Sequence, residues 1–129
     1  MWEDVLGFKV LFFSQDGKTS PILDYLMKMT ISSNDLSIKV IQEINRIGIK
    51  IYEKQDIKYI KIGKKSFFEL RVQSSSNICR VFFILEDKCI IILHAFTKKS
   101  QKISKTDLER GVLNLDHYKK YKSTIDSNL

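Results

Sequence analysis

The feature that most constrains the fold is a series of short apolar segments in the second half of the chain, each ended by polar turn residues. These segments are rich in β-branched and aromatic side chains, which favour strands. They predict strands at residues 57–62, 67–73, 78–85 and 89–96. Because turns of only three or four residues join the last three strands, these strands predict an antiparallel meander.

Helical periodicity dominates the segments on either side of this meander. Ser20 and Pro21 suit the N-cap and the first position of a helix, and apolar residues follow at helical spacing. A second helix is predicted from Leu36 to Ile47, so the two helices would form a hairpin. Ser104 is typical of the N-cap of a last helix.

These elements predict an α+β fold in a single domain, residues 1–129. An apolar strand at residues 7–13 and the helical hairpin would pack on the antiparallel meander, and the C-terminal helix would follow it. A chain of this length has room for one hydrophobic core and not for two. The polar residues 122–129 are expected to form a flexible tail.

Alternation along the predicted strands assigns the side chains to two faces. One face is entirely apolar and is expected to pack against helices. The other face carries Arg71 and Arg80, which a four-residue loop places directly opposite each other. A three-residue loop between the last two strands places His94 opposite Arg80, with Glu69 diagonal to Arg80. We therefore expect a row of Arg71, Arg80 and His94 across three strands.

Two interpretations of this row stay open. Like charges directly opposite each other destabilise a sheet, by up to about 1 kcal/mol per pair. Two guanidinium groups in fork geometry suit phosphate oxygens, which favours an anion site. The alternative is a pair of solvated arginines at the end of a sheet, beside a buried structural histidine.

The distribution of charge favours a polyanionic partner. The chain carries a net charge of +7, and the segment from Lys98 to Lys122 holds eight basic against three acidic residues, a net +5. A charged run is usually a solvated face. This one begins where the strand of His94 leaves the sheet, so its lysines are expected to crowd the arginine row and form a phosphate-backbone site.

Several classes of protein are excluded by the composition. The longest apolar runs, residues 81–85 and 89–93, are far shorter than the roughly 20 residues of a membrane-spanning helix. The acidic start of the chain does not resemble a signal peptide, so a cytoplasmic location is expected. Cys79 and Cys89 are expected to be free thiols. No Cys/His cluster has zinc spacing, and no metal or cofactor is predicted.

Several segments carry a resemblance to a known family. They are residues 59–61, 68–71, 80–83 and 93–102, with shorter pieces between residues 16 and 26. The stretch from His94 to Lys102 is the most specific of them. Over residues 8–115 the chain resembles the HigB-type, phage-derived host-killing toxins of the RelE/ParE superfamily.

The resemblance implies helices packed on a curved antiparallel sheet, in agreement with the fold predicted from the residues. It also implies the toxin of a type II toxin–antitoxin pair, and the HigB and RelE branches cleave mRNA, commonly in the ribosomal A site. A HigA-type helix-turn-helix antitoxin would neutralise the toxin. Operator DNA would be bound only through the toxin–antitoxin complex.

Site residues follow from the resemblance and from the residues themselves. Matching positions carry the family's basic catalytic and RNA-contacting roles to Arg71, Arg80, Lys98, Lys99 and Lys102, with Lys61 a further RNA-binding candidate. Reasoning from chemistry adds two catalytic candidates. His94 is the best candidate base, because neighbouring arginines would keep it neutral, although a buried structural histidine is equally compatible. Glu69 would act as a base or orient Arg71.

Two departures and two alternatives qualify this function. Phe67 and Glu69 stand where RelE carries lysines, which argues against RelE-like general-base chemistry. One alternative is a ParE-like toxin that binds DNA gyrase and cleaves nothing. The other is a non-catalytic basic module that binds nucleic acid. The fold alone does not distinguish among them.

Overall fold

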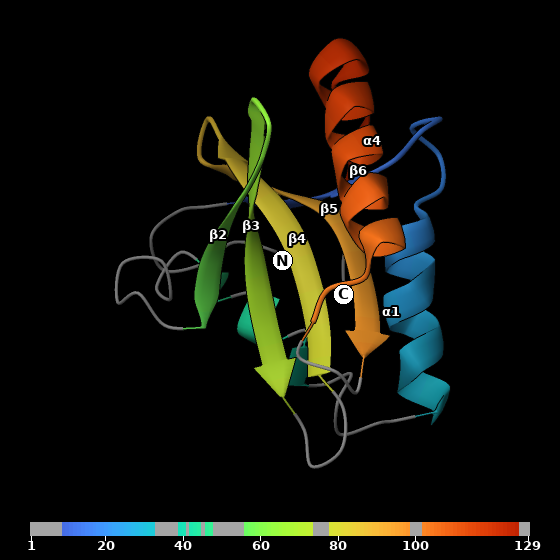
Figure 1. The fold of residues 1–129 in the computed structure, drawn as a ribbon. Helices are drawn as coiled ribbons and strands as arrows, with labels where there is room; N and C mark the ends of the chain where they lie inside the picture. The colour runs from blue at the N-terminus through green and yellow to red at the C-terminus, as the bar shows by residue number, and fades with distance from the viewer. Residues whose placement is uncertain are drawn as a thin grey trace.

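The structure is a computed structural model that describes residues 9–32, 39–40, 42–44, 46–47, 56–73, 78–98 and 102–126 (Figure 1). Its centre is a six-stranded sheet with the order β2-β3-β4-β5-β1-β6. The strands are β1 (Lys9–Phe13), β2 (Ile57–Ile62), β3 (Lys65–Gln73), β4 (Ile78–Glu86), β5 (Cys89–Lys98) and β6 (Thr124–Asp126). The helices bounded in full are α1 (Pro21–Ser32) and α4 (Lys105–Tyr121).

The α+β class is confirmed, together with the N-terminal strand, the meander and the C-terminal helix. Helix α1 begins at Pro21, as predicted, and β2 has the predicted bounds. Only part of the predicted second helix is among the described residues. There Val40, Ile44 and Ile47 are helical and fully buried in the core.

Both ends of helix α4 are built by local hydrogen bonds. At its start the Ser104 hydroxyl accepts from the backbone N–H of Asp107 at 3.1 Å, which confirms the predicted N-cap. At its end Lys122 is left-handed, with a φ of 53°, and its N–H donates to the Tyr118 carbonyl at 2.7 Å. This turn sends the chain back toward the sheet.

The expectation of a flexible tail from residue 122 is wrong for Thr124–Asp126, which form β6. This strand pairs antiparallel with β1, and Ile125 packs against the core. Lys9 Nζ lies 3.3 Å from an Asp126 carboxylate oxygen. The segment is mostly polar, so its residues carry no signal for a strand. One apolar residue and pairing with the edge of β1 hold it in the sheet.

The register of the meander agrees with the prediction between β3 and β4 and differs between β4 and β5. Arg71 pairs with Arg80, as predicted. The next turn has two residues, Asp87 and Lys88, with φ values of 50° and 61°, and not the three expected. Such a turn has positive φ at both central positions, which matches the twist of the flanking strands.

A β-bulge between Phe82 and Phe83 shifts the register once more. As a result His94 lies opposite Phe82, and Phe96 lies opposite Arg80. The predicted position of His94 beside Arg80 is therefore wrong. The bulge adds a residue to one strand and cannot be read from the alternation of side chains.

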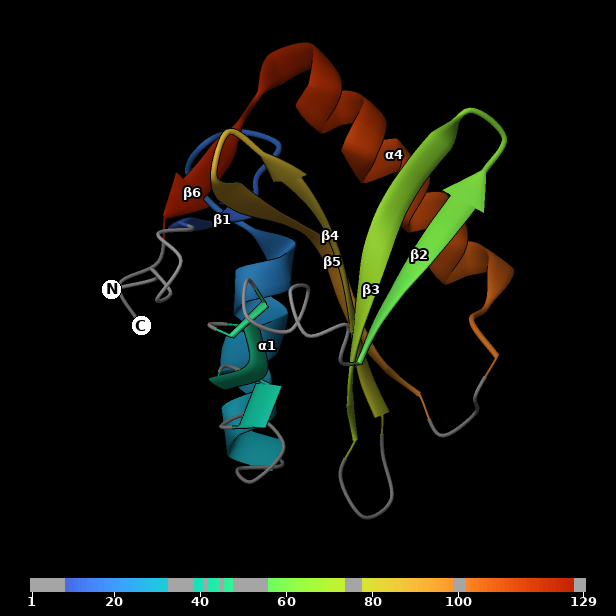
Figure 2. The same ribbon diagram turned by 90° about the vertical axis from the view of Figure 1, so that its left-hand side faces the viewer.

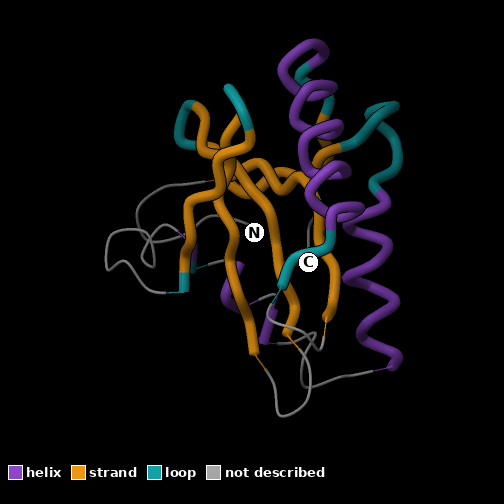
Figure 3. Tube along the Cα trace, viewed as in Figure 1, coloured by secondary structure: helices purple, strands orange, loops and turns teal. Residues whose placement is uncertain are grey.

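Helices cover both faces of the sheet (Figures 2 and 3). Helix α1 lies on one side and α4 crosses the other. Under α4, Phe67 and Phe82 are fully buried, and their ring centroids are 4.7 Å apart. The sheet face that carries Arg80 is therefore also packed against a helix. From the sequence, such packing was expected only for the entirely apolar face.

Gly111 allows α4 to approach this face closely. A Cβ atom at this position would lie 2.8 Å from Phe82 Cδ2 and 3.1 Å from Phe67 Cζ. In an exposed helix, Gly→Ala stabilises by about 1 kcal/mol. Here we expect Gly111→Ala to lower the free energy of unfolding by about 1–3 kcal/mol, because the buried rings must move.

Urea denaturation measures this effect, with Glu109→Ala on the exposed side of the same helix as the control. Glu109→Ala is expected to change stability by less than about 0.5 kcal/mol. A gain in stability for Gly111→Ala would show that α4 does not press on the two rings.

No helix among the described residues is both long and apolar enough to cross a membrane.

Candidate functional site

A buried ion pair lies under the start of helix α4. Glu69 on β3 and Arg80 on β4 have side chains that are 0% and 2% exposed. Arg80 Nη1 donates to Glu69 Oε2 at 2.9 Å. The carboxylate therefore offsets the repulsion that two facing arginines impose on a sheet. It also means that Arg80 is a structural cation as well as a candidate for binding.

Arg71 has a different environment from Arg80, although the two residues face each other. Its side chain is 38% exposed, and its Nε lies 4.0 Å from the second carboxylate oxygen of Glu69. Its backbone N–H donates to the Asp56 carbonyl at 3.1 Å, which ties β3 to the start of β2. Glu69 thus lies between a buried guanidinium and an accessible one.

The two arginines border a cavity of 430 Å³, called the basic cavity below. Its walls come from β2, β3, β4 and the start of α4. The residues that line it are Lys58, Tyr59, Ile60, Lys61, Arg71, Arg80, Lys102, Ile103 and Leu108. Five of them are cationic and none is acidic. A concave site lined by one sign of charge concentrates ions of the opposite sign.

The structure brings together five of the eight predicted site residues. Glu69 supports the basic cavity from behind, and four others line it: Lys61, Arg71, Arg80 and Lys102. Lys99 lies outside the described residues. Lys98 ends β5 opposite Ile78, and its side chain is also outside the described part of the chain.

The expectation that the C-terminal lysines crowd the arginine row is wrong for the end of α4. Lys119 Nζ and Lys122 Nζ lie 3.4 Å and 2.6 Å from the two carboxylate oxygens of Glu86, at the β4–β5 turn. The hydrogen bond from Lys122 lowers the pKa of Glu86. A 17-residue helix is about 25 Å long, so these charges lie at the opposite end of α4 from Lys102.

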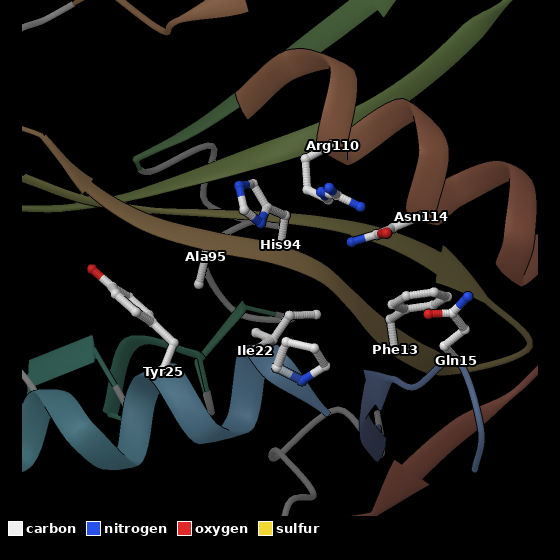
Figure 4. Close-up of a pocket in the computed structure, with 9 residues that line it drawn as sticks. Phe13, Gln15, Ile22, Tyr25, His94, Ala95, Arg110 and Asn114 are labelled. Atoms are coloured by element: carbon white, nitrogen blue, oxygen red, sulfur yellow. The ribbon is translucent and has the colours of Figure 1, made fainter. Parts of the chain in front are cut away.

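His94 lines a different cavity, of 470 Å³, at the edge of β5 (Figure 4). Figure 4 shows its ring on the side of α4, near Arg110, while Ala95 points toward α1. His94 Nε2 lies 3.0 Å from a carboxylate oxygen of Asp107. Its ring also stacks on Phe96, with centroids 5.2 Å apart. This histidine therefore joins β5 to the start of α4.

Burial lowers the pKa of His94, and the neighbouring Asp107 opposes this effect in part. The predicted direction is confirmed, but its main cause is burial. Among charges, only a smaller effect of Arg110 acts in the same direction, and neither Arg71 nor Arg80 contributes. The neutral ring is the form that the fold prefers.

The stability of the protein is expected to fall as the pH drops below about 6.5, through the protonation of His94 in the unfolded chain. The sign follows from linkage: the unfolded state binds more protons at this site, so unfolding is favoured at low pH. Urea denaturation at pH 7.5 and 5.5 measures the change. His94→Gln removes the titrating group and should show a smaller drop; an equal drop would contradict the assignment.

The remaining candidates for chemistry lie away from the basic cavity. Tyr118 donates to Glu86 at 3.1 Å, and His117 packs edge-on against Phe13, both near the end of α4. Cys79 and Cys89 are free thiols, as predicted, and burial raises the pKa of Cys79 to about 12. The described residues contain no group of three or more His, Cys, Asp or Glu side chains placed to hold a metal ion.

Among the polar residues of the basic cavity, Lys58 was not predicted as a site residue, and Tyr59 entered only through the resemblance of residues 59–61. The signal that would have found Lys58 is the register of β2, which pairs it with Glu69. Asp107 was likewise predicted only as part of a helix start. Its link to His94 depends on the approach of α4 to β5, which no local pattern reveals.

The fold and this site define a class of protein: a small α+β domain with a basic cavity on one end of its sheet, suited to a polyanion. The family model described as "Phage derived protein Gp49-like (DUF891)" matches residues 24–115, which are 92 of the 129 residues. The chain therefore belongs to the phage-derived Gp49-like family, a family of RelE/HigB-like toxins. No curated protein matches the sequence significantly.

Proposed function

We propose that this protein is the toxin of a type II toxin–antitoxin pair, of the HigB type, and that it is an endoribonuclease. Its substrate is mRNA at the ribosome, and its cleavage needs no metal ion. Membership of a RelE/HigB-like family supports the toxin assignment. The observation that carries the enzymatic part is the basic cavity, in which Arg71 is accessible and held beside a fixed, buried Arg80–Glu69 pair.

The proposed chemistry is attack of a 2′-hydroxyl oxygen on the adjacent phosphorus. The hydroxyl loses its proton, the 5′-oxygen leaves with one, and extra negative charge builds up on the phosphoryl oxygens. Arg71 and Lys102 bind those oxygens in this proposal. Preorganised cations are most effective where they need not move during the reaction, and the Glu69 carboxylate restricts the movement of both arginines.

Two predicted roles are revised in this proposal, and one pair of roles is kept. Glu69 positions the arginines and is not the base, because it is fully buried and bonded to Arg80. His94 positions the start of α4 through Asp107, because it lines the other cavity. Lys98 and Lys99 keep their predicted roles in binding the RNA backbone and stabilising charge.

The proposed partners follow from the same site. A HigA-type helix-turn-helix antitoxin covers the basic cavity with an acidic or shielding surface, and the complex binds operator DNA through the antitoxin. Both the substrate and the ribosome place the toxin in the cytoplasm. Charge complementarity at such an interface would speed association and fix its register.

The test is to incubate the purified protein with translating ribosomes and to map the ends of the mRNA. New ends within the coding sequence are the expected result. Intact mRNA together with loss of DNA gyrase supercoiling activity would instead indicate a ParE-like toxin. Intact mRNA with active gyrase and retained binding of RNA would indicate a non-catalytic module.

A further inference from the structure

Tyr59 is an aromatic residue whose ring is supported on one side and open on the other. It lies on β2, an edge strand of the sheet (Figure 2), and the residue is 58% exposed. Across the strand pair its ring lies 5.5 Å from that of Phe68. Phe68 in turn stacks on the fully buried Phe83, with centroids 5.4 Å apart. A ladder of rings thus holds Tyr59 in place.

Tyr59 also borders two cavities that are lined by cations. One is the basic cavity, and the other, of 470 Å³, lies between the β2–β3 hairpin and α4. The second cavity contains Lys64, Lys65 and Lys119, and its acidic residue, Asp116, is paired with Lys65. Tyr59 therefore lines both cavities, and of the lysines in the second cavity Lys119 is also paired with Glu86.

The spacing along β2 suits an extended chain. Residues rise about 3.3 Å each in a strand. Tyr59 lies three residues from Asp56, which bonds to the backbone of Arg71, and three residues from Ile62, which pairs with Lys65. Along the strand, the backbone positions of Arg71 and Lys65 therefore lie about 10 Å from Tyr59 in opposite directions.

We propose that Tyr59 is a stacking platform for an unpaired base of single-stranded RNA. The RNA backbone runs along β2, from the basic cavity toward Lys64 and Lys65. This inference rests on the proposed function, because it assumes that RNA enters the basic cavity. Exposed aromatic rings flanked by Lys and Arg are the usual means of holding single strands. Alternation places the predicted RNA-binding residue Lys61 on the same side of β2 as Tyr59. It places Lys58 on the other side with Glu69 and Arg71, so the bound strand passes over the edge of β2.

A binding experiment with a non-cleavable probe tests the platform. A fluorescent 12-nucleotide RNA carrying 2′-O-methyl groups is titrated with the full-length protein at fixed salt, and its anisotropy gives Kd. Tyr59→Ala is expected to weaken binding about tenfold, since it removes the stacking of one base on the ring. Tyr59→Phe keeps the ring and should bind like the wild type.

Tyr121→Ala is the matched control, because Tyr121 is also 58% exposed and lies at the far end of α4. It should leave Kd unchanged. A second probe of equal charge, with its internal bases removed, separates stacking from charge. The wild type should lose affinity for this probe, whereas Tyr59→Ala should bind both probes equally.

Equal Kd values for Tyr59→Ala and Tyr121→Ala, in variants that melt like the wild type, would overturn the platform. So would failure of the wild type to bind the probe. If Tyr59→Ala instead loses only the capture of an antitoxin, the ring belongs to a protein interface and the proposal is wrong. If the protein cleaves mRNA but its binding of RNA does not depend on Tyr59, the proposed function is supported and the platform is wrong. If binding of RNA depends on the Tyr59 ring but no mRNA is cleaved, the platform is supported and the proposed nuclease activity is wrong.

Discussion

Arg80→Ala is expected to lower the free energy of unfolding by about 3–5 kcal/mol, the range measured when one partner of a buried ion pair is removed. The substitution leaves the carboxylate of Glu69 buried with its 2.9 Å hydrogen bond gone. Neither side chain is accessible enough for water to replace that bond. Urea denaturation at neutral pH measures the loss, and the proposed toxicity should fall with the fraction of folded protein.

A double variant separates the charge from the packing. Replacing both partners, Glu69→Leu with Arg80→Met, removes both charges and keeps most of the apolar volume. Its stability should be close to that of the wild type, because well-packed apolar residues often replace a buried pair without loss. Wild-type stability in Arg80→Ala alone would contradict the burial of the pair.

Arg71→Ala is expected to abolish the proposed mRNA cleavage while leaving the fold intact. Removal of a preorganised charge at a developing oxyanion typically costs about 10²–10³-fold in rate. Because the Arg71 side chain is 38% exposed, stability should change by less than about 1 kcal/mol. The measurement is the rate of appearance of new mRNA ends on translating ribosomes, with urea denaturation of the same sample.

Arg110→Ala is the matched control for Arg71→Ala. It removes the same group and the same charge, but from the cavity at the edge of β5. Its cleavage rate should equal that of the wild type. Full activity of Arg71→Ala, or equal losses in both variants, would show that net charge and not the basic cavity supports the activity.

The contrast between these two arginines shows what the sequence alone was able to predict. The alternation in β3 and β4 predicted that they face each other, with Glu69 close by, and the pairing confirms it. Which arginine is buried depends on tertiary packing, which leaves the Arg80 side chain 2% exposed and the Arg71 side chain 38% exposed. That packing joins segments far apart in the chain, so no local pattern contains it.

His94 shows the limit of predicting register from turns. The sequence at Glu86 to Lys88 is compatible with a loop of two or of three residues. A two-residue loop needs positive φ at Asp87 and Lys88, and neither residue type signals that conformation strongly. The shorter turn shifts the β4–β5 register by one residue, and the bulge shifts it by one more. His94 therefore pairs with Phe82, and not with Arg80 as predicted. The histidine is buried, which agrees with the structural alternative that stayed open for it, and it lies beside another cavity.

The position of β1 in the sheet has a consequence for the order of folding. It pairs with β5 about 80 residues later and with β6 about 115 residues later. During synthesis β1 emerges first but has no neighbour until most of the chain has been made. Contacts of such long range close slowly and favour folding in milliseconds to seconds. A partly synthesised chain thus exposes an apolar strand with two unpaired edges, which a chaperone is suited to protect.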